Sequence, residues 1–321
     1  MIKVLVLSDI DNLYIQRQRY QNIEFVFDTN EEYDFLAILD DVGKSFNCKV
    51  PKRRRILYLG EPPYIKPYSS SYLKQFGVVV GCHKLSCNNY IKNRTVLPFR
   101  VGLEKGFGYD YFNNLVFSKE NRINKFCIVT SNKKFTDGHR KRVEFVEKIK
   151  QEYPDMLDIF GNGYEHISDK YDVLSKYKYC LAIENCVYEN YWTEKISDSY
   201  LSGCYPFYYG CPNIFNYFPK SSLEIIDIND YQSTVLKMKE ALYSKNPKYK
   251  LEHLLHARNL VLNDYNVFSV IANDVLNLLK KEKEEKYKYN GFEYQMLSPY
   301  QYTLWTKVRQ KLAWKFNIII P

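Results

Sequence analysis

The chain has 321 residues, of which 45% are hydrophobic and 26% charged, and its formal net charge is +9. This length exceeds what one small core needs and predicts two domains of ordinary globular composition. No apolar run is long enough to span a bilayer. The positive charge suits an anionic ligand, nucleic acid or an acidic membrane, but no nucleic-acid-binding signature accompanies it, so we expect no nucleic-acid partner.

The N-terminus begins directly with an apolar run, MIKVLVLSDI, without the flanks of a signal peptide, which predicts a cytoplasmic protein. Eight cysteines lie mostly in apolar runs and are typical of reduced core thiols. Two patterns raise the alternative of a metal site: Cys82 with His83 and Cys87, and Asp9-Ile10-Asp11. The first lacks a second ligand pair and the second follows a strand as a turn would, so we expect no bound metal.

The first third of the chain predicts a parallel sheet. Four apolar runs, residues 2–7, 34–39, 55–59 and 77–80, have the composition of buried parallel strands. Each run ends in a polar loop, and one of these loops is Gly60-Glu61-Pro62-Pro63. Ligands of open α/β sheets bind at the carboxyl ends of the strands, so these loops are the first candidate positions for a site.

A second α/β series follows a polar stretch without clear periodicity, residues 100–125, which predicts a linker between domains at 1–118 and 119–285. Strands are predicted at 126–130, 157–160, 180–183, 205–209 and 222–228. Helices are predicted at 139–152, 170–176, 193–201, 230–244 and 250–281. The order of these elements indicates an α/β fold class.

The remaining residues, 286–321, form a basic tail. From Tyr300 to Ile320 the pattern predicts an amphipathic helix with Trp and Phe on one side and cations elsewhere. Two interpretations stay open: the helix packs back on the protein, or it makes peripheral contact with the anionic inner face of the cell membrane.

The stretch from Tyr177 to Pro219 carries the clearest sign of function. It predicts a strand, a polar loop, a short helix and a second strand within about forty residues. Lys195 falls in the first turn of the helix, where the helix dipole disfavours a cation, whereas Glu194 beside it suits that dipole. The position of Lys195 is explained if a phosphate-type anion binds there, because free N–H groups and the ammonium would bind it together.

The same stretch, YKYCLAIENCVYENYWTEKISDSYLSGCYPFYYG followed by NYFP, resembles the signature of glycosyltransferase family 10, the α1,3/α1,4-fucosyltransferases, in a bacterial type. Shorter matches upstream extend the likeness over most of residues 55–230. The resemblance implies a GT-B fold, in which two Rossmann-like domains face each other across a cleft. It also implies an inverting transfer of L-fucose from GDP-fucose to a hydroxyl of a glycan acceptor in polysaccharide biosynthesis, without a required cofactor.

The resemblance further implies roles for individual residues. Glu61 would be the general base that accepts the proton of the acceptor hydroxyl. Lys195 and an arginine of the basic helix would bind the pyrophosphate; Arg142 fits best by its spacing to Phe145, and Arg140 is the close rival. Glu194 would favour the cationic transition state of the sugar. The residues implied for donor binding are Arg142, Arg140, Asn185, Tyr191, Glu194 and Lys195.

Three residues depart from the family pattern: Ile183, Cys186 and Trp192. None removes a charged group, so the reaction class is kept, but the bulk of Trp192 leaves open a nucleotide sugar other than GDP-fucose. A catalytically inactive protein that binds a glycan or nucleotide is a further alternative. The sequence does not indicate an oligomeric state or a particular acceptor.

Overall fold

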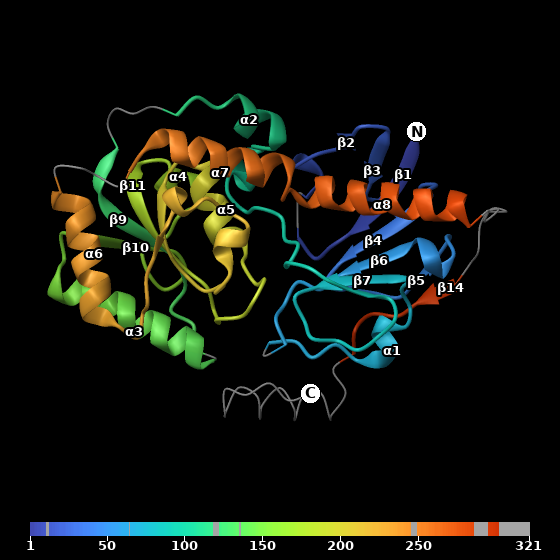
Figure 1. Cartoon of the computed structure of the whole chain (residues 1–321), viewed down its shortest axis with the longest axis horizontal. Coiled ribbons are helices and arrows are strands. Elements are labelled where there is room, and N and C mark those ends of the chain that lie inside the picture. The colour runs from blue at the N-terminus through green and yellow to red at the C-terminus, as the bar shows by residue number, and fades with distance from the viewer. Residues whose placement is uncertain are drawn as a thin grey trace. The chain divides into compact units, whose positions relative to one another are not determined.

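The computed structural model describes residues 1–10, 13–63, 65–117, 122–134, 136–244, 249–285 and 295–301. The chain forms two compact units, each built around a mainly parallel sheet with helices (Figure 1). Unit 1 comprises Met1–Pro98 and Asp264–Pro321, and unit 2 comprises Phe99–Asn263. The predicted α/β fold with parallel sheets is confirmed.

Unit 1 contains a seven-stranded sheet in the order β2-β3-β1-β4-β6-β7-β8. All neighbouring strands are parallel except β2 and β3. The strands are β1 (Ile2–Leu7), β2 (Arg19–Tyr20), β3 (Ile23–Val26), β4 (Phe35–Leu39), β6 (Arg55–Tyr58), β7 (Val78–Gly81) and β8 (Tyr90–Lys92). The four predicted strands of this region are confirmed, and the short strands β2, β3 and β8 were not predicted.

Smaller elements complete unit 1. Strand β5 (Phe46–Cys48) pairs antiparallel with β14 (Gln295–Leu297), which brings a late segment of the chain back to the first domain. The short helical elements are η1 (Leu13–Ile15), η2 (Lys52–Arg54) and α1 (Ser70–Leu73). Most of the predicted tail helix, residues 302–321, lies outside the described residues.

Helix α8 (Val267–Glu284) covers one face of the unit 1 sheet (Figure 1). Its apolar side chains are buried with those of β1, β3 and β4, and the ring of Phe268 lies 4.7 Å from that of Phe25. The single helix predicted over 250–281 is therefore two helices in two units. A new helix, α8, begins after Asn266, whose side chain caps it by accepting the N–H of Phe268 at 2.9 Å.

We expect Phe268→Ala to lower the free energy of unfolding of unit 1 by about 3–5 kcal/mol, because it leaves a cavity between α8 and the sheet. Leu236→Ala, at a helical side chain that is 59% exposed, is the matched control and should change stability by less than about 0.5 kcal/mol. Chemical denaturation measures both. Equal effects of the two substitutions would contradict the packing of α8 on this sheet.

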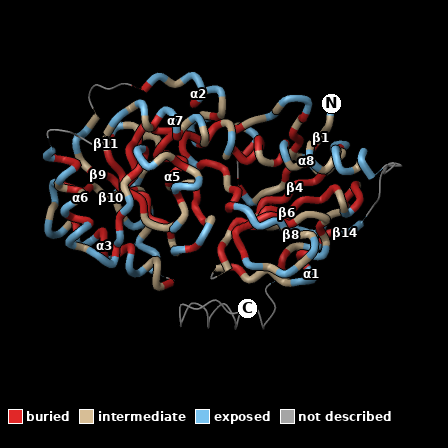
Figure 2. The backbone as a smooth tube through the Cα atoms, viewed as in Figure 1, coloured by how far each residue is buried: buried red, intermediate tan, exposed pale blue. Residues whose placement is uncertain are grey.

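Unit 2 contains a five-stranded parallel sheet in the order β10-β9-β11-β12-β13. The strands are β9 (Ile123–Val129), β10 (Leu157–Phe160), β11 (Tyr177–Ile183), β12 (Tyr205–Tyr209) and β13 (Glu224–Ile225). The first four of these strands confirm the prediction, and β13 is shorter than the predicted 222–228. Figure 2 shows these strands as a buried centre with exposed helical surfaces outside it.

Helices lie on both faces of this sheet, with α3 and α6 on one face and α4 and α5 on the other (Figure 1). Right-handed connections between parallel strands produce this arrangement, because the chain moves from β9 to the edge strand β10 and then crosses the sheet in the opposite direction to β11. The helices are α2 (Tyr109–Asn114), α3 (Asp137–Glu152), α4 (Tyr171–Leu174), α5 (Glu194–Leu201), α6 (Tyr231–Tyr243) and α7 (Leu251–Asn263). The 3-10 turns are η3 (Leu103–Lys105), η4 (Ile214–Asn216) and η5 (Lys220–Ser222).

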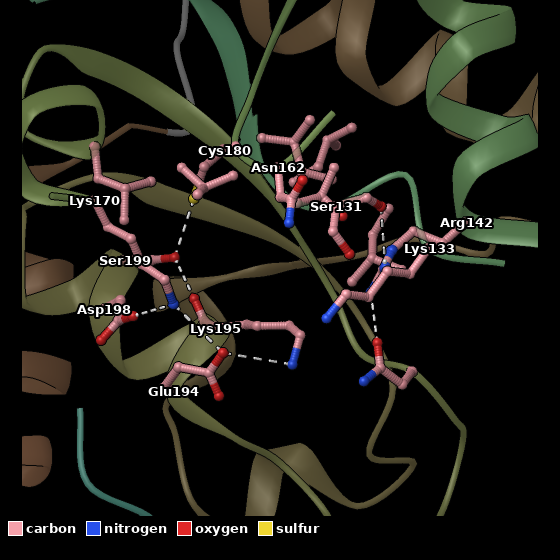
Figure 3. Close-up of a pocket in the computed structure, with 18 of the residues that line it drawn as sticks. Ser131, Lys133, Arg142, Asn162, Lys170, Cys180, Glu194, Lys195, Asp198 and Ser199 are labelled. Atoms are coloured by element: carbon pink, nitrogen blue, oxygen red, sulfur yellow. Dashed lines mark hydrogen bonds and ion pairs between the residues drawn. The ribbon is translucent and has the colours of Figure 1, made fainter. Parts of the chain in front are cut away.

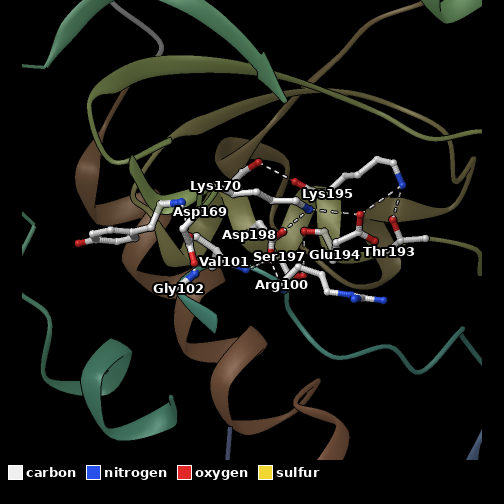
Figure 4. A network of polar contacts seen from close by, with 12 residues as sticks. Arg100, Val101, Gly102, Asp169, Lys170, Thr193, Glu194, Lys195, Ser197 and Asp198 are labelled. Atoms are coloured by element: carbon white, nitrogen blue, oxygen red, sulfur yellow. Dashed lines mark hydrogen bonds and ion pairs between the residues drawn. The ribbon is translucent and has the colours of Figure 1, made fainter. Parts of the chain in front are cut away.

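The stretch predicted as a linker, residues 100–125, belongs largely to unit 2, so the division lies between Pro98 and Phe99 rather than at residue 118. Two buried carboxylates bind its backbone (Figure 4). Asp198 accepts the N–H groups of Arg100 and Val101 at 2.8 and 3.1 Å. Asp169 accepts those of Gly102 and Glu104 at 2.8 and 3.1 Å. The sequence did not reveal these contacts, because Asp169 and Asp198 are distant in sequence from the backbone groups that they bind.

The predictions of reduced cysteines and of no membrane span concern all the described residues. All eight cysteines are free thiols, and six of them are buried. Among the described helices, none combines the length and the hydropathy that a membrane span requires.

Candidate functional site

A cavity of about 400 Å³ lies at the carboxyl ends of β9, β10 and β11 in unit 2. The N-terminal turns of α3 and α5 both contribute to its lining, so the positive ends of two helix dipoles meet there. Figure 3 shows Ser131, Lys133 and Arg142 reaching it from one side and residues of α5 from the other. Four predicted residues are brought together in this pocket: Arg142, Asn185, Glu194 and Lys195.

Two glycines allow the loops around the pocket to approach each other. A Cβ atom on Gly138 would lie 1.9 Å from the carbonyl oxygen of Asn185. One on Gly161, whose φ is +112°, would lie 2.1 Å from the carbonyl oxygen of Thr130. Any larger residue would force these backbones apart and open the pocket.

Arg142 is a buried cation, 5% exposed, that has only neutral hydrogen-bond acceptors among the described residues. Its Nη1 donates to the side-chain oxygen of Asn185, and its Nη2 lies 3.5 Å from the carbonyl oxygen of Ser131. Its Nε has no partner in the described part of the chain. Burial lowers the pKa of this guanidinium, although nearby Glu184 opposes that effect. A buried cation without a negatively charged hydrogen-bond partner favours the binding of an anion.

Lys195 is held by a buried carboxylate that the sequence analysis missed, Glu184, which is 1% exposed. The Lys195 Nζ donates to Glu184 Oε2 at 3.0 Å and to Thr193 Oγ1 at 2.9 Å. Burial acts against the charged amine, but the carboxylates of Glu184 and Glu194 outweigh it and raise the pKa of Lys195. The residue is therefore a fixed cation, and its place at a helix start is compensated within the protein.

Glu184 also controls how α5 begins. It accepts the backbone N–H and the hydroxyl of Thr193, both at 2.8 Å. Thr193 is the N-cap of α5, yet its side chain forms no capping hydrogen bond, because its hydroxyl is turned toward Glu184. The first turn of α5 therefore keeps its N–H groups without a side-chain cap from Thr193, as an anion-binding helix start requires.

A second ion-pair network places Lys170 in the pocket (Figure 4). Its Nζ lies 2.7 Å from Asp198 Oδ2 and 3.4 Å from Glu194 Oε1. Burial alone would raise the pKa of Glu194, but the ammonium groups of Lys195 and Lys170 lower it below the usual range. Lys170 and Asp198 were not predicted. The available signal was the spacing of Glu194 and Asp198, four residues apart on one helical face.

Two predicted donor residues do not line this pocket. Arg140 projects from the exposed side of α3, where it forms an ion pair with Asp137. Tyr191 is 2% exposed and belongs to the core next to the pocket loop. Trp192, the residue that departs most in size from the family pattern, is also buried, and its ring packs 5.1 Å from that of Phe218.

The predicted base, Glu61, lies in unit 1 directly after β6, within a polar cluster. Asp40 at the end of β4 accepts the N–H of Gly60 at 3.1 Å, the ammonium of Lys66 at 2.6 Å and the hydroxyl of Tyr68. The Glu61 N–H donates to that hydroxyl oxygen at 3.3 Å. Asp40 has a φ of +73°, a left-handed conformation that a non-glycine residue adopts where its surroundings impose it. This cluster holds the backbone of the Glu61 loop in place.

Among the described residues, no group of three or more His, Cys, Asp or Glu side chains is placed to hold an ion. Burial raises the pKa of the Cys82 thiol to about 11, which disfavours the thiolate that a metal would need. Asp11 of the Asp9-Ile10-Asp11 string lies outside the described residues.

The part of the chain that contains the pocket matches a known protein family. Residues 118–252 match the family described as Glycosyltransferase family 10 (fucosyltransferase) C-term. The matched residues lie within unit 2 and include Arg142, Asn185, Glu194 and Lys195. The resemblance predicted from the central stretch is confirmed for this part of the chain.

Individual relatives match over shorter stretches. The chain is 41% identical over 58 residues to GDP-fucose protein O-fucosyltransferase 3 of Danio rerio, covering 18% of this chain and 13% of the relative. It is 35% identical over 85 residues to Alpha-(1,3)-fucosyltransferase FucT of Helicobacter pylori, covering 26% of this chain and 18% of the relative. Both matches span far less than two thirds of the relative. They come from an animal and a bacterium, so the bacterial type stays a prediction.

Several solved structures align over most of the chain. A crystal structure of alpha1,3-fucosyltransferase with GDP has a TM-score of 0.47 and 19% sequence identity to this chain. The alignment covers 83% of this chain and 92% of that chain.

Proposed function

We propose that this chain is an inverting glycosyltransferase of family 10 that transfers L-fucose from GDP-fucose to a hydroxyl of a glycan or polysaccharide acceptor. The observation that carries the proposal is the buried guanidinium of Arg142, which has only neutral described partners in a pocket lined by two helix N-termini. A pyrophosphate would supply the charge that this guanidinium lacks. The family match and the fucosyltransferases among the relatives support GDP-fucose as its source.

In this proposal, the donor half of the site works through charge. Arg142 and Lys195 bind the pyrophosphate and stabilise the negative charge that develops on the departing GDP. Glu194 remains ionised because two ammonium groups lower its pKa, and its negative charge favours the cationic character of the sugar in the transition state. Asn185 holds the Arg142 side chain and Glu184 holds that of Lys195, so little reorganisation of these two cations is needed during the reaction.

The acceptor half of the proposed reaction uses Glu61 of unit 1, in the role that the family resemblance implies for it. Glu61 accepts the proton of the acceptor hydroxyl as its oxygen forms a bond to the anomeric carbon. The bond from that carbon to the GDP oxygen breaks in the same displacement. One displacement inverts the anomeric configuration, and neither a covalent intermediate nor a metal is part of this scheme.

The position of Trp192 removes one reason to consider a sugar other than fucose. The residue was a reason to consider another hexose, because a bulky side chain beside the donor would change the shape of the pocket. Its ring instead packs against Phe218 and Tyr217, at 5.1 and 5.8 Å, and does not line the cavity. The substitution is therefore compatible with the donor that the family name indicates.

A panel of nucleotide sugars tests the proposed function. We expect GDP-fucose to raise the midpoint of thermal unfolding, because a ligand that binds only the folded state stabilises it. We also expect release of GDP when a glycan acceptor is added. Lys195→Met should raise the GDP-fucose concentration needed for the same stabilisation by at least about tenfold, since it removes a charge-assisted contact. Stabilisation by UDP-sugars but not by GDP-fucose would contradict the proposal.

A further inference from the structure

An imidazole also lines the pocket, although the sequence analysis assigned it no role. His139 lies in the first turn of α3, and its side chain contributes to the cavity wall. The N-cap residue Thr136 fixes it: the His139 N–H donates to Thr136 Oγ1 at 3.2 Å, and the same oxygen lies 2.7 Å from His139 Nδ1. The contact at Nδ1 therefore fixes the orientation of the ring.

The groups around His139 are mainly cations. Arg142 lies one turn further along α3, Lys195 comes from α5, and Lys133 comes from the loop after β9; all three line the same cavity. Burial first, and then the charges of these three residues, lower the pKa of His139 to about 4.

Other charged groups near this cluster are already paired. Asp137 and Arg140 on the same helix form an ion pair with each other. Glu184 and Glu194 are directed to the ammonium of Lys195, at 3.0 and 3.7 Å. The imidazole is therefore neutral at neutral pH, beside an anion site that has an excess of positive charge.

We propose that His139 is a further binding residue for the pyrophosphate of the donor, and that its imidazole takes up a proton when this anion binds. The inference rests on the proposed function, because it needs an anionic nucleotide between Arg142 and Lys195. The bound phosphates would compensate the cations that disfavour imidazolium and would accept a charge-assisted hydrogen bond from it. At about 6 Å and an effective dielectric constant of about 20, each negative charge raises the proton affinity about a hundredfold.

The sign of the pH dependence follows from linkage. A group whose pKa rises on binding takes up a proton between its free and bound pKa values, so the ligand binds most tightly at low pH. The pKa of His139 is about 4 without ligand, and two phosphate charges would move it toward neutrality. We therefore expect the affinity to fall by up to about tenfold per pH unit as the pH rises through 5.5–7.5.

Isothermal titration calorimetry of the full chain with GDP-fucose, without acceptor, tests the inference. Both phosphates of GDP-fucose are esterified and keep one charge each over this range, so the ligand itself takes up no proton. Titrations at pH 6 in two buffers with different ionisation enthalpies count the protons. We expect uptake of about half to one proton. Binding without any proton uptake would overturn the role of His139 and leave the proposed function intact.

Two variants assign the proton to its residue. His139→Gln keeps a neutral polar side chain that cannot titrate, and we expect it to abolish the uptake and flatten the pH dependence of the dissociation constant. His256→Gln, at an exposed histidine of α7, is the matched control and should retain the uptake. Uptake that persists in His139→Gln would overturn the inference. Absence of GDP-fucose binding at every pH would instead remove the proposed function on which it rests.

Discussion

Replacement of Glu61 by glutamine should lower the turnover of sugar transfer by about 100- to 10,000-fold, which is the usual contribution of a positioned general base. Glutamine has nearly the same shape as glutamate but cannot accept the proton of the acceptor hydroxyl. The affinity for GDP-fucose should stay within about twofold of the unmodified protein, because Arg142 and Lys195 belong to unit 2, whereas Glu61 belongs to unit 1. Steady-state release of GDP measures turnover, and calorimetry measures donor binding.

The substitution at Glu61 should leave the loop in place. Its backbone is held through Tyr68 and Asp40, and neither of these contacts uses the Glu61 carboxylate. Glu31→Gln, at an exposed carboxylate in a turn of the same unit, is the matched control and should keep full turnover. Full turnover in Glu61→Gln would assign the base to another residue, and loss of donor binding in that variant would mean that the two units do not act independently.

Replacement of Arg142 by glutamine should weaken GDP-fucose binding by about 10- to 150-fold, the range expected for losing a hydrogen bond to a charged group. Burial makes this contact strong, because water does not screen the guanidinium and the phosphate. The free energy of unfolding without ligand should change little, because the guanidinium has no described carboxylate partner to lose. Calorimetric titration and chemical denaturation measure the two quantities.

Arg140→Gln is the informative comparison for this prediction, since both arginines lie two residues apart on α3. The Arg140 side chain is 47% exposed and pairs with Asp137, and an exposed pair of this kind contributes little. We expect its removal to change the donor affinity by less than about fivefold. The reverse pattern, a large loss at Arg140 and none at Arg142, would identify the rival arginine as the donor contact.

Local patterns in the sequence were sufficient for much of the fold. Apolar runs predicted β1, β4, β6 and β12, because a strand buried on both faces needs a continuous apolar stretch. The short strands β3 and β8 were missed, since they are held by register with their neighbours more than by their own composition. The apolar stripe of α8 was visible, but not the sheet that it covers, because amphipathicity identifies a buried face and not its partner.

The sequence by itself determined which residues could form a donor site. The Lys195 position beside Glu194 at a helix start indicated an anion, and the family resemblance implied an arginine of the basic helix for the donor contact, with Arg142 preferred and Arg140 as the close rival. Only the tertiary structure decided how these groups are held. Lys195 meets Glu184 from the preceding strand end, Lys170 meets Asp198, and His139 meets three cations. Except for Arg142 beside His139, these contacts join different elements of the chain, and local spacing carries no information on contacts that folding alone creates.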